Sequence, residues 1–234
     1  MALKQWLSDL LGVVYPATCP VCGNALSRGE EVICLQCLAD MPRCRFHKSD
    51  FNAIHQKLVG TQVLVDRAAA LFFYSRKSPY VGLIHRAKYD GQPRIIRWLA
   101  ETLAREIQAD GFFDGIDLII PVPLHRGKLR RRGYNQSHVL AEGLEAVTGI
   151  PVGDNLQALK PHDTQTRRDA SARWQNADGV YSVEDAGALA GKHVLVVDDV
   201  ITTGATIHSC CLALLQAQPT IRLSVLSIGV TSLD

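Results

Sequence analysis

One stretch constrains the fold more than any other: residues 194–206, which read VLVVDDVITTGAT. Four consecutive apolar residues predict a strand that is buried on both faces, as in the centre of a parallel sheet. Two carboxylates, Asp198 and Asp199, end this strand, and a turn of small and hydroxyl-bearing residues follows at once. Because ligands of open α/β sheets bind beyond the carboxyl ends of the strands, the sequence predicts a ligand site here.

The rest of the chain favours an α/β fold. From residue 63 onward, apolar strand patterns alternate with helical patterns, which predicts a parallel sheet of about five strands with right-handed crossovers. A chain of 234 residues with 47% hydrophobic composition can bury one main domain and a small module. We expect an N-terminal helix and metal-stapled module over residues 1–48, a linker over 49–62 and the main domain over 63–234.

The bulk composition excludes several classes of protein. A net charge of +2 gives no overall signature of polyanion binding. No apolar run approaches the roughly 18 residues of a membrane span, and Gln5 and Asp9 interrupt the apolar N-terminus. Without a secretory signal we expect a reducing, cytoplasmic compartment. The N-terminal spacing predicts an amphipathic helix packed on the protein's own body, with its apolar face made of Leu3, Trp6, Leu7, Leu10, Leu11 and Val14.

Four of the seven cysteines have metal-ligand spacing. The pattern C-x2-C-x11-C-x2-C is formed by Cys19, Cys22, Cys34 and Cys37. Two such pairs can place four thiolates around a tetrahedral Zn²⁺ ion, and a module this small needs such a staple. Cys44, His47 and His55 do not complete a second site, and whether they bind anything stays open.

The turn after the acids has the features of a phosphate cradle. The start of a helix presents free backbone N–H groups and partial positive charge, a glycine allows close approach, and threonine hydroxyls add donors. Carboxylates repel phosphate, so the two aspartates would face sugar hydroxyls, or a Mg²⁺ ion shared with them. The motif therefore predicts a ligand like ribose 5-phosphate, with its phosphate on Thr202, Thr203, Gly204, Ala205 and Thr206.

This stretch resembles the signature with which type I phosphoribosyltransferases bind 5-phosphoribosyl-1-pyrophosphate (PRPP). Together with LIHRAKYDG, PVPLHRGKLRRRGYNQS and YPATCPVC, it makes nearly the whole chain similar to the ComF family of phosphoribosyltransferase-like proteins. The resemblance implies a type I phosphoribosyltransferase sheet with an N-terminal zinc ribbon, and Mg²⁺ bound with PRPP. It also implies a link to the uptake and use of exogenous DNA in bacteria.

The resemblance assigns roles to particular residues. Asp198 and Asp199 would be the catalytic acids. A basic loop opposite the phosphate turn would hold the pyrophosphate through Arg126, Lys128, Arg131 and Arg132, with Arg130 beside them. A mobile segment carrying Gln165, Arg173 and Asn176 would close over the site.

Two helix residues and the basic loop allow more than one interpretation. The LIHRAKYDG pattern puts His85 and Lys88 on one helical face, which favours a structural or phosphate-facing pair over a catalytic one. The basic loop could also contact the backbone of single-stranded DNA, with Tyr134 as a stacking ring, and this role can coexist with pyrophosphate binding.

Two functions therefore remain open. The protein could transfer a phosphoribosyl group from PRPP to an acceptor nitrogen, which the sequence does not identify. It could instead be a non-catalytic DNA-handling protein that keeps the PRPP pocket as a sensor and acts with other DNA-uptake proteins.

Overall fold

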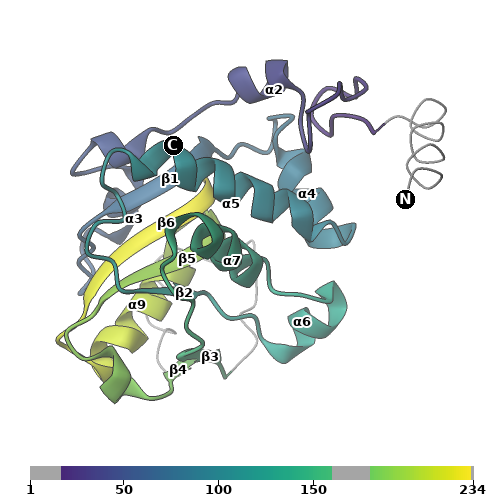
Figure 1. Cartoon of the computed structure of the whole chain (residues 1–234). Coiled ribbons are helices and arrows are strands. Elements are labelled where there is room, and N and C mark those ends of the chain that lie inside the picture. Colours follow the sequence, from purple (N-terminus) through teal and green to yellow (C-terminus); the bar gives the residue numbers. More distant parts are fainter. Residues whose placement is uncertain (1–16, 160–179, 233–234) are drawn as a thin grey trace.

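The computed structural model describes residues 17–159 and 180–232 (Figure 1). The strands are β1 (Ala68–Phe73), β2 (Leu118–Pro121), β3 (Leu156–Ala158), β4 (Tyr181–Val183), β5 (His193–Ile201) and β6 (Arg222–Val230). The α-helices are α2 (Leu35–Ala39), α3 (Ala53–Leu58), α4 (Val81–Tyr89), α5 (Pro93–Gln108), α6 (Arg126–Arg132), α7 (Gln136–Thr148) and α9 (Ala205–Ala217). Two short 3-10 helices are η1 (Phe46–Lys48) and η2 (Ala186–Leu189).

The main sheet is parallel and has the order β1-β6-β5-β2. Its four strands in the described part of the chain are fewer than the five expected, because β3 and β4 pair antiparallel in a separate sheet. The apolar run Val194–Val197 of β5 is fully buried between β6 and β2, as its composition predicts. The predicted α/β fold class is therefore confirmed.

Helices cover both faces of this sheet. The helices α4, α5 and α7 pack on one face, and α9 packs on the other together with α3 and the β3-β4 pair (Figure 1). Leu195 and Val197 of β5 belong to the first core, whereas Val194 and Val196 belong to the second. This alternation is the normal period of a strand, and it decides which face each residue of β5 meets.

The N-terminal segment is packed into the same structure. Cys19, Cys34 and Cys37 share a core with α4 and α5, and the hydroxyl of Tyr80 donates a hydrogen bond of 2.7 Å to the carbonyl of Cys37. The range 49–62, expected as a linker, contains α3.

The helix α3 is anchored on the second core. Asn52 and His55 cap it reciprocally, and Ile54 and Leu58 are buried. This part of the chain thus has fixed contacts with the main sheet.

The basic segment differs from its prediction. Residues 126–132 form the helix α6 rather than a loop. The sequence of this helix contains no proline or β-branched residue, the His125 side chain accepts a hydrogen bond from Gly127 N at its start, and Gly133 ends it in a left-handed conformation (φ 81°). The predicted loop was therefore wrong, because the positive charges of this segment do not indicate its conformation.

A second difference concerns β5. The strand continues to Ile201, so the two aspartates lie inside it and not at its end. None of the described helices is both long and apolar enough to span a bilayer.

Candidate functional site

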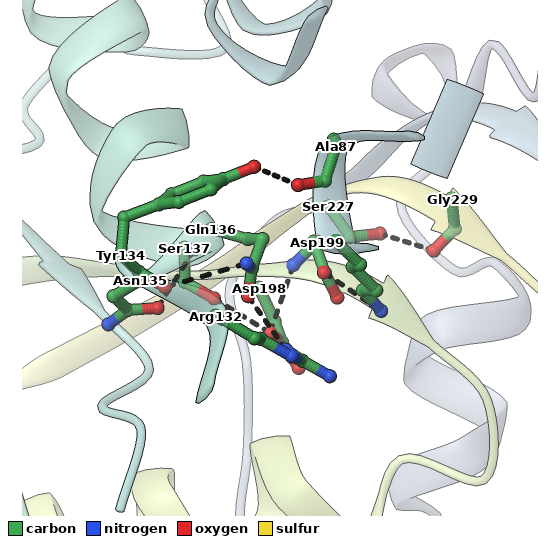
Figure 2. Close-up of polar contacts among 11 residues, drawn as sticks. Ala87, Arg132, Tyr134, Asn135, Gln136, Ser137, Asp198, Asp199, Ser227 and Gly229 are labelled. Carbon is green, nitrogen blue, oxygen red and sulfur yellow. Dashed lines mark hydrogen bonds and ion pairs between the residues drawn. The ribbon is translucent and has the colours of Figure 1, made fainter. Parts of the chain in front are cut away.

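The acid pair, Asp198 and Asp199, has two different sets of partners (Figure 2). Asp199 is buried, and its carboxylate lies 2.9 Å from the ammonium group of Lys88 on α4. Asp198 is partly buried, and its Oδ1 accepts hydrogen bonds from the hydroxyl of Ser137 and from the backbone N–H of Asp199, each 2.9 Å long. The two carboxylates are therefore not equivalent.

The charges of these groups influence one another. Burial raises the pKa of Asp198 to about 7, and repulsion from Asp199 adds to this, whereas Lys88 and Ser137 act in the opposite direction. Burial alone would lower the pKa of Lys88, but attraction by Asp199 and Asp198 outweighs it and leaves the pKa raised. Near neutral pH, Lys88 is therefore charged and Asp198 is close to its titration midpoint.

The phosphate turn, Thr202–Thr206, leads directly from β5 into α9. Gly204 is the N-cap residue of α9 and has φ +83°, a conformation that glycine adopts without strain. A Cβ atom at Gly204 would also lie 3.0 Å from the Cβ of Lys57 on α3. The glycine thus allows both the turn and the close packing of α3 behind it.

Three further hydrogen bonds hold this turn in place. The hydroxyl of Thr231 donates to the carbonyl of Thr202 over 2.9 Å, and Lys57 Nζ donates to the same hydroxyl over 3.2 Å. Thr203 Oγ1 accepts from the N–H of Ala205 at 3.4 Å. The exposed hydroxyls of the turn are thus held on a backbone that Thr231, the residue after β6, and Lys57 of α3 support.

The basic helix α6 divides its charges between two directions. Arg132 is partly buried, donates to Gln136 Oε1 over 2.7 Å and lies over the ring of Tyr89, 5.7 Å from its centroid. Arg132 Nε is buried and has no hydrogen-bond partner among the described residues. Lys128 is half-buried, whereas Arg126, Arg130 and Arg131 are exposed.

The structure thus separates residues that the sequence groups together. Arg132 lies beside the acid pair in Figure 2, and its charge acts on Lys88. The exposed arginines face solvent. The predicted lid residues Gln165, Arg173 and Asn176 lie outside the described residues.

Several residues of the site were missed or misjudged from the sequence. Ser137 ends the motif PVPLHRGKLRRRGYNQS but was given no role, and the partner of Lys88 could not be identified because it lies 111 positions away along the chain. Tyr134, considered as a stacking ring, instead donates its hydroxyl to the carbonyl of Ala87 and so joins α4 to the start of α7. The exposed ring beside α6 is Tyr89, with 63% of its surface accessible.

The cysteine cluster, Cys19, Cys22, Cys34 and Cys37, brings its four sulfur atoms within 4.8 Å of one another. The distance between the sulfurs of Cys22 and Cys34 is 3.7 Å. A tetrahedral zinc site with Zn–S bonds of about 2.3 Å has sulfur–sulfur distances of about 3.8 Å. The residues present therefore fit Zn²⁺, and Cys44 is not part of this cluster.

Comparison with known proteins identifies relatives of the chain. The family described as "Phosphoribosyl transferase domain" matches residues 137–229, which include the acid pair and the phosphate turn. Competence protein F of Haemophilus influenzae is 36% identical over 132 residues, which are 54% of this chain and 57% of that protein. The chain thus spans little more than half the length of this relative.

Two other relatives match over longer ranges. DNA utilization protein YhgH of Escherichia coli (strain K12) is 28% identical over 215 residues, or 90% of each chain. Competence protein ComFC of Bacillus subtilis is 24% identical over 201 residues, which are 85% of this chain and 71% of that protein. These matches confirm the predicted resemblance to ComF proteins, and residues 137–229 are similar to the phosphoribosyl transferase domain family.

Proposed function

We propose that this homologue of competence protein F and ComFC binds PRPP, together with Mg²⁺, across the carboxyl end of β5. The observation that carries the proposal is that the acid pair lies within the last four residues of β5, and that this strand leads into the N-terminal turn of a 13-residue helix, α9. Such a turn suits the 5-phosphate, and Asp198, four positions before Thr202, suits the ribose hydroxyls.

Three groups of the chain would divide the ligand among them. The phosphate turn would bind the 5-phosphate through backbone N–H groups and threonine hydroxyls. Asp198 would accept hydrogen bonds from the ribose hydroxyls through Oδ2, because both of its hydrogen bonds from described residues end on Oδ1. Arg132 would meet the pyrophosphate, and its buried Nε has a donor to offer.

The residues present fit Mg²⁺ only together with the ligand. Lys88 already neutralises Asp199, which leaves too few carboxylate oxygens for a dedicated all-protein site. Mg²⁺ commonly binds through few carboxylates and through the phosphates of its substrate. When bound, it would offset the negative charge of the pyrophosphate.

As a transferase, the chain would hold C1 of the ribose where an acceptor nitrogen can attack it. The C1–N bond would form as the C1–O bond to pyrophosphate breaks, and the acceptor's proton would leave to solvent. Arg132 would stabilise the charge that develops on the leaving group, and the fixed phosphate turn would supply orientation.

Calorimetric titration with PRPP and excess Mg²⁺ tests the binding. We expect saturable binding of PRPP and weaker binding of ribose 5-phosphate, which lacks the pyrophosphate. Absence of binding for both ligands would refute the proposed function. Incubation with PRPP, Mg²⁺ and a panel of nucleobases and amines, followed by pyrophosphate measurement, then separates a transferase from a protein that only binds PRPP.

A second candidate function is contact with single-stranded DNA. It is favoured by the exposed arginines of α6 next to the exposed ring of Tyr89, which combine backbone charge with a stacking surface. Fluorescence anisotropy with a labelled oligonucleotide should show binding that weakens steeply with salt, because each neutralised phosphate releases counterions. A lack of binding at about 50 mM salt, where such contacts are strong, excludes this function for the isolated chain.

A further inference from the structure

We propose that Lys88 is a positioning residue of the site, which neutralises and holds Asp199 so that Asp198 alone meets the ligand's hydroxyls. This inference rests on the proposed function and changes the assignment of its two acids. From the sequence, Asp198 and Asp199 share one role. In the structure they divide it.

The first argument is the burial of the ion pair. The side chains of Lys88 and Asp199 are 18% and 9% exposed, and their charged atoms are 2.9 Å apart. A buried carboxylate without a partner is strongly unfavourable, so Asp199 depends on Lys88. An aspartate that is buried and already paired is poorly placed to accept hydrogen bonds from a ligand as well.

The second argument is the direction of each side chain. Leu195 and Val197 face the core beneath α4, α5 and α7, so the alternation of β5 places Asp199 on the same side, where Lys88 meets it. By the same alternation Asp198 leaves the strand toward the other face of the sheet, although its Oδ1 also accepts a hydrogen bond from Ser137 at the start of α7. Burial raises the pKa of Tyr181 and of Cys210, and the negative charge of Asp198 raises both further. Both residues lie on that side of the sheet. The phosphate turn leads into α9 on this same side, so Asp198 is the acid that shares a face with the cradle.

The third argument is the charge of the ligand. PRPP carries a phosphate and a pyrophosphate, and two unpaired carboxylates beside it would repel it. Lys88 cancels one of them. What remains for the ligand is one carboxylate, the phosphate turn and Arg132, a combination that suits a polyanionic sugar.

The fourth argument is the fixation of α4. At its first turn, a Cβ atom on Gly82 would lie 3.4 Å from the carbonyl of Pro20, next to the cysteine cluster. Near its last turn, the carbonyl of Ala87 accepts the hydroxyl of Tyr134. Only about 9 Å of helix separates Gly82 from Lys88. The ammonium group is therefore presented by a helix that is held at both ends.

A double-mutant cycle tests the proposal. The variants are Lys88→Met, Lys88→Arg, Asp199→Asn and Lys88→Met with Asp199→Asn, with Lys77→Met as a control at an exposed lysine. Affinity for PRPP with Mg²⁺ is measured by calorimetry and the unfolding temperature by calorimetric scanning.

We expect Lys88→Met to weaken PRPP binding at least tenfold, because an unpaired Asp199 then faces the ligand. The double variant should return to within about threefold of wild type, since it removes the unpaired charge. Lys88→Arg should keep most of the affinity, and Lys77→Met should change nothing. Unchanged affinity in folded Lys88→Met would overturn the proposal. A double variant as weak as Lys88→Met would also overturn it, because Lys88 would then touch the ligand itself.

The unfolding temperatures separate this proposal from the proposed function. If wild-type protein binds no PRPP, the proposed function fails, while the cycle still reports on the ion pair. A drop in unfolding temperature in Lys88→Met that is largely recovered in the double variant supports the pairing. Strictly additive shifts refute it.

Discussion

The cysteine cluster and the acid pair are assembled in opposite ways. The cluster takes all four of its thiols from a segment of 19 residues, Cys19 to Cys37. The acid site combines Lys88, Ser137 and Asp198–Asp199, which lie on three elements spread over more than 100 positions. A site built from one segment can be read from spacing, whereas a site built by topology depends on contacts that only the fold creates. The two sites should therefore fail differently when they are altered.

The largest effect is expected at the cysteine cluster. Cys37→Ser should remove about one equivalent of zinc, measured by metal analysis. It should also lower the free energy of unfolding by several kcal/mol, because zinc binding in such sites is worth about 10–16 kcal/mol. Since three of the cysteines share the core of α4 and α5, the loss should spread beyond the N-terminal segment. Cys44→Ser is the matched control and should retain the metal. Wild-type protein purified without chelators that contains no zinc contradicts this assignment.

A substitution in the acid pair should have the opposite effect, because it should weaken ligand binding while the protein stays folded. Asp198→Asn should weaken PRPP binding by roughly 1.5–3 kcal/mol, the value of a charge-assisted hydrogen bond. Its unfolding temperature at pH 8 should not fall, because folding disfavours the charged form of Asp198. Asp154→Asn, at an exposed aspartate, serves as the control. Equal losses in Asp198→Asn and Asp199→Asn, measured by calorimetry, would remove the distinction between the two acids.

Substitutions of the arginines on α6 should have a smaller effect on PRPP binding. Arg132→Ala should weaken PRPP binding by about 1.4 kcal/mol, or tenfold, through loss of one charged donor. Arg130→Ala with Arg131→Ala should leave PRPP binding unchanged and reduce the salt dependence of any DNA binding, measured by anisotropy. If the outer pair lowers PRPP affinity as much as Arg132→Ala does, α6 acts as a single surface.

The smallest effect is a dependence on pH. With a pKa of about 7 for Asp198, raising the pH from 6.5 to 8 increases its charged fraction about fourfold, and PRPP affinity should rise by the same factor. Asp199, Lys88, Tyr181 and Cys210 are the ionisable groups that surround it. Because ligand phosphates also titrate, the dependence is measured as the difference between wild type and Asp198→Asn. Identical pH profiles for the two proteins would contradict the prediction.

The same titration has a signature in stability. The pKa of Asp198 in the folded protein lies above its ordinary value of 3.8, so the folded state binds more protons than the unfolded state between about pH 4 and 7. Its contribution to the free energy of unfolding therefore falls as the pH rises through this window. Asp198→Asn should remove this part of the pH dependence.

The sequence predicts the framework of this protein well. The buried run of β5, the 16-residue helix α5 and the four cysteines follow from hydrophobic period and spacing alone. The partners of the acids do not follow, because neither Ser137 nor Lys88 has a spacing relation to Asp198 or Asp199. The helix α6 was missed because a run of arginines indicates charge and says little about conformation. The exposed arginines of α6 could be distinguished from the partly buried Arg132 only in the structure, where Arg132 lies over the ring of Tyr89.

The strand order has a consequence for how the chain is made. β1, near the start, pairs with β6, the last strand, with Ala68 opposite Val225. Lys57 on α3 likewise donates to Thr231, near the C-terminus. During synthesis, β1 and the support behind the phosphate turn must wait until β6 and Thr231 have left the ribosome. The cysteine segment has no such delay, so zinc can be bound by the nascent chain well before a ligand pocket exists.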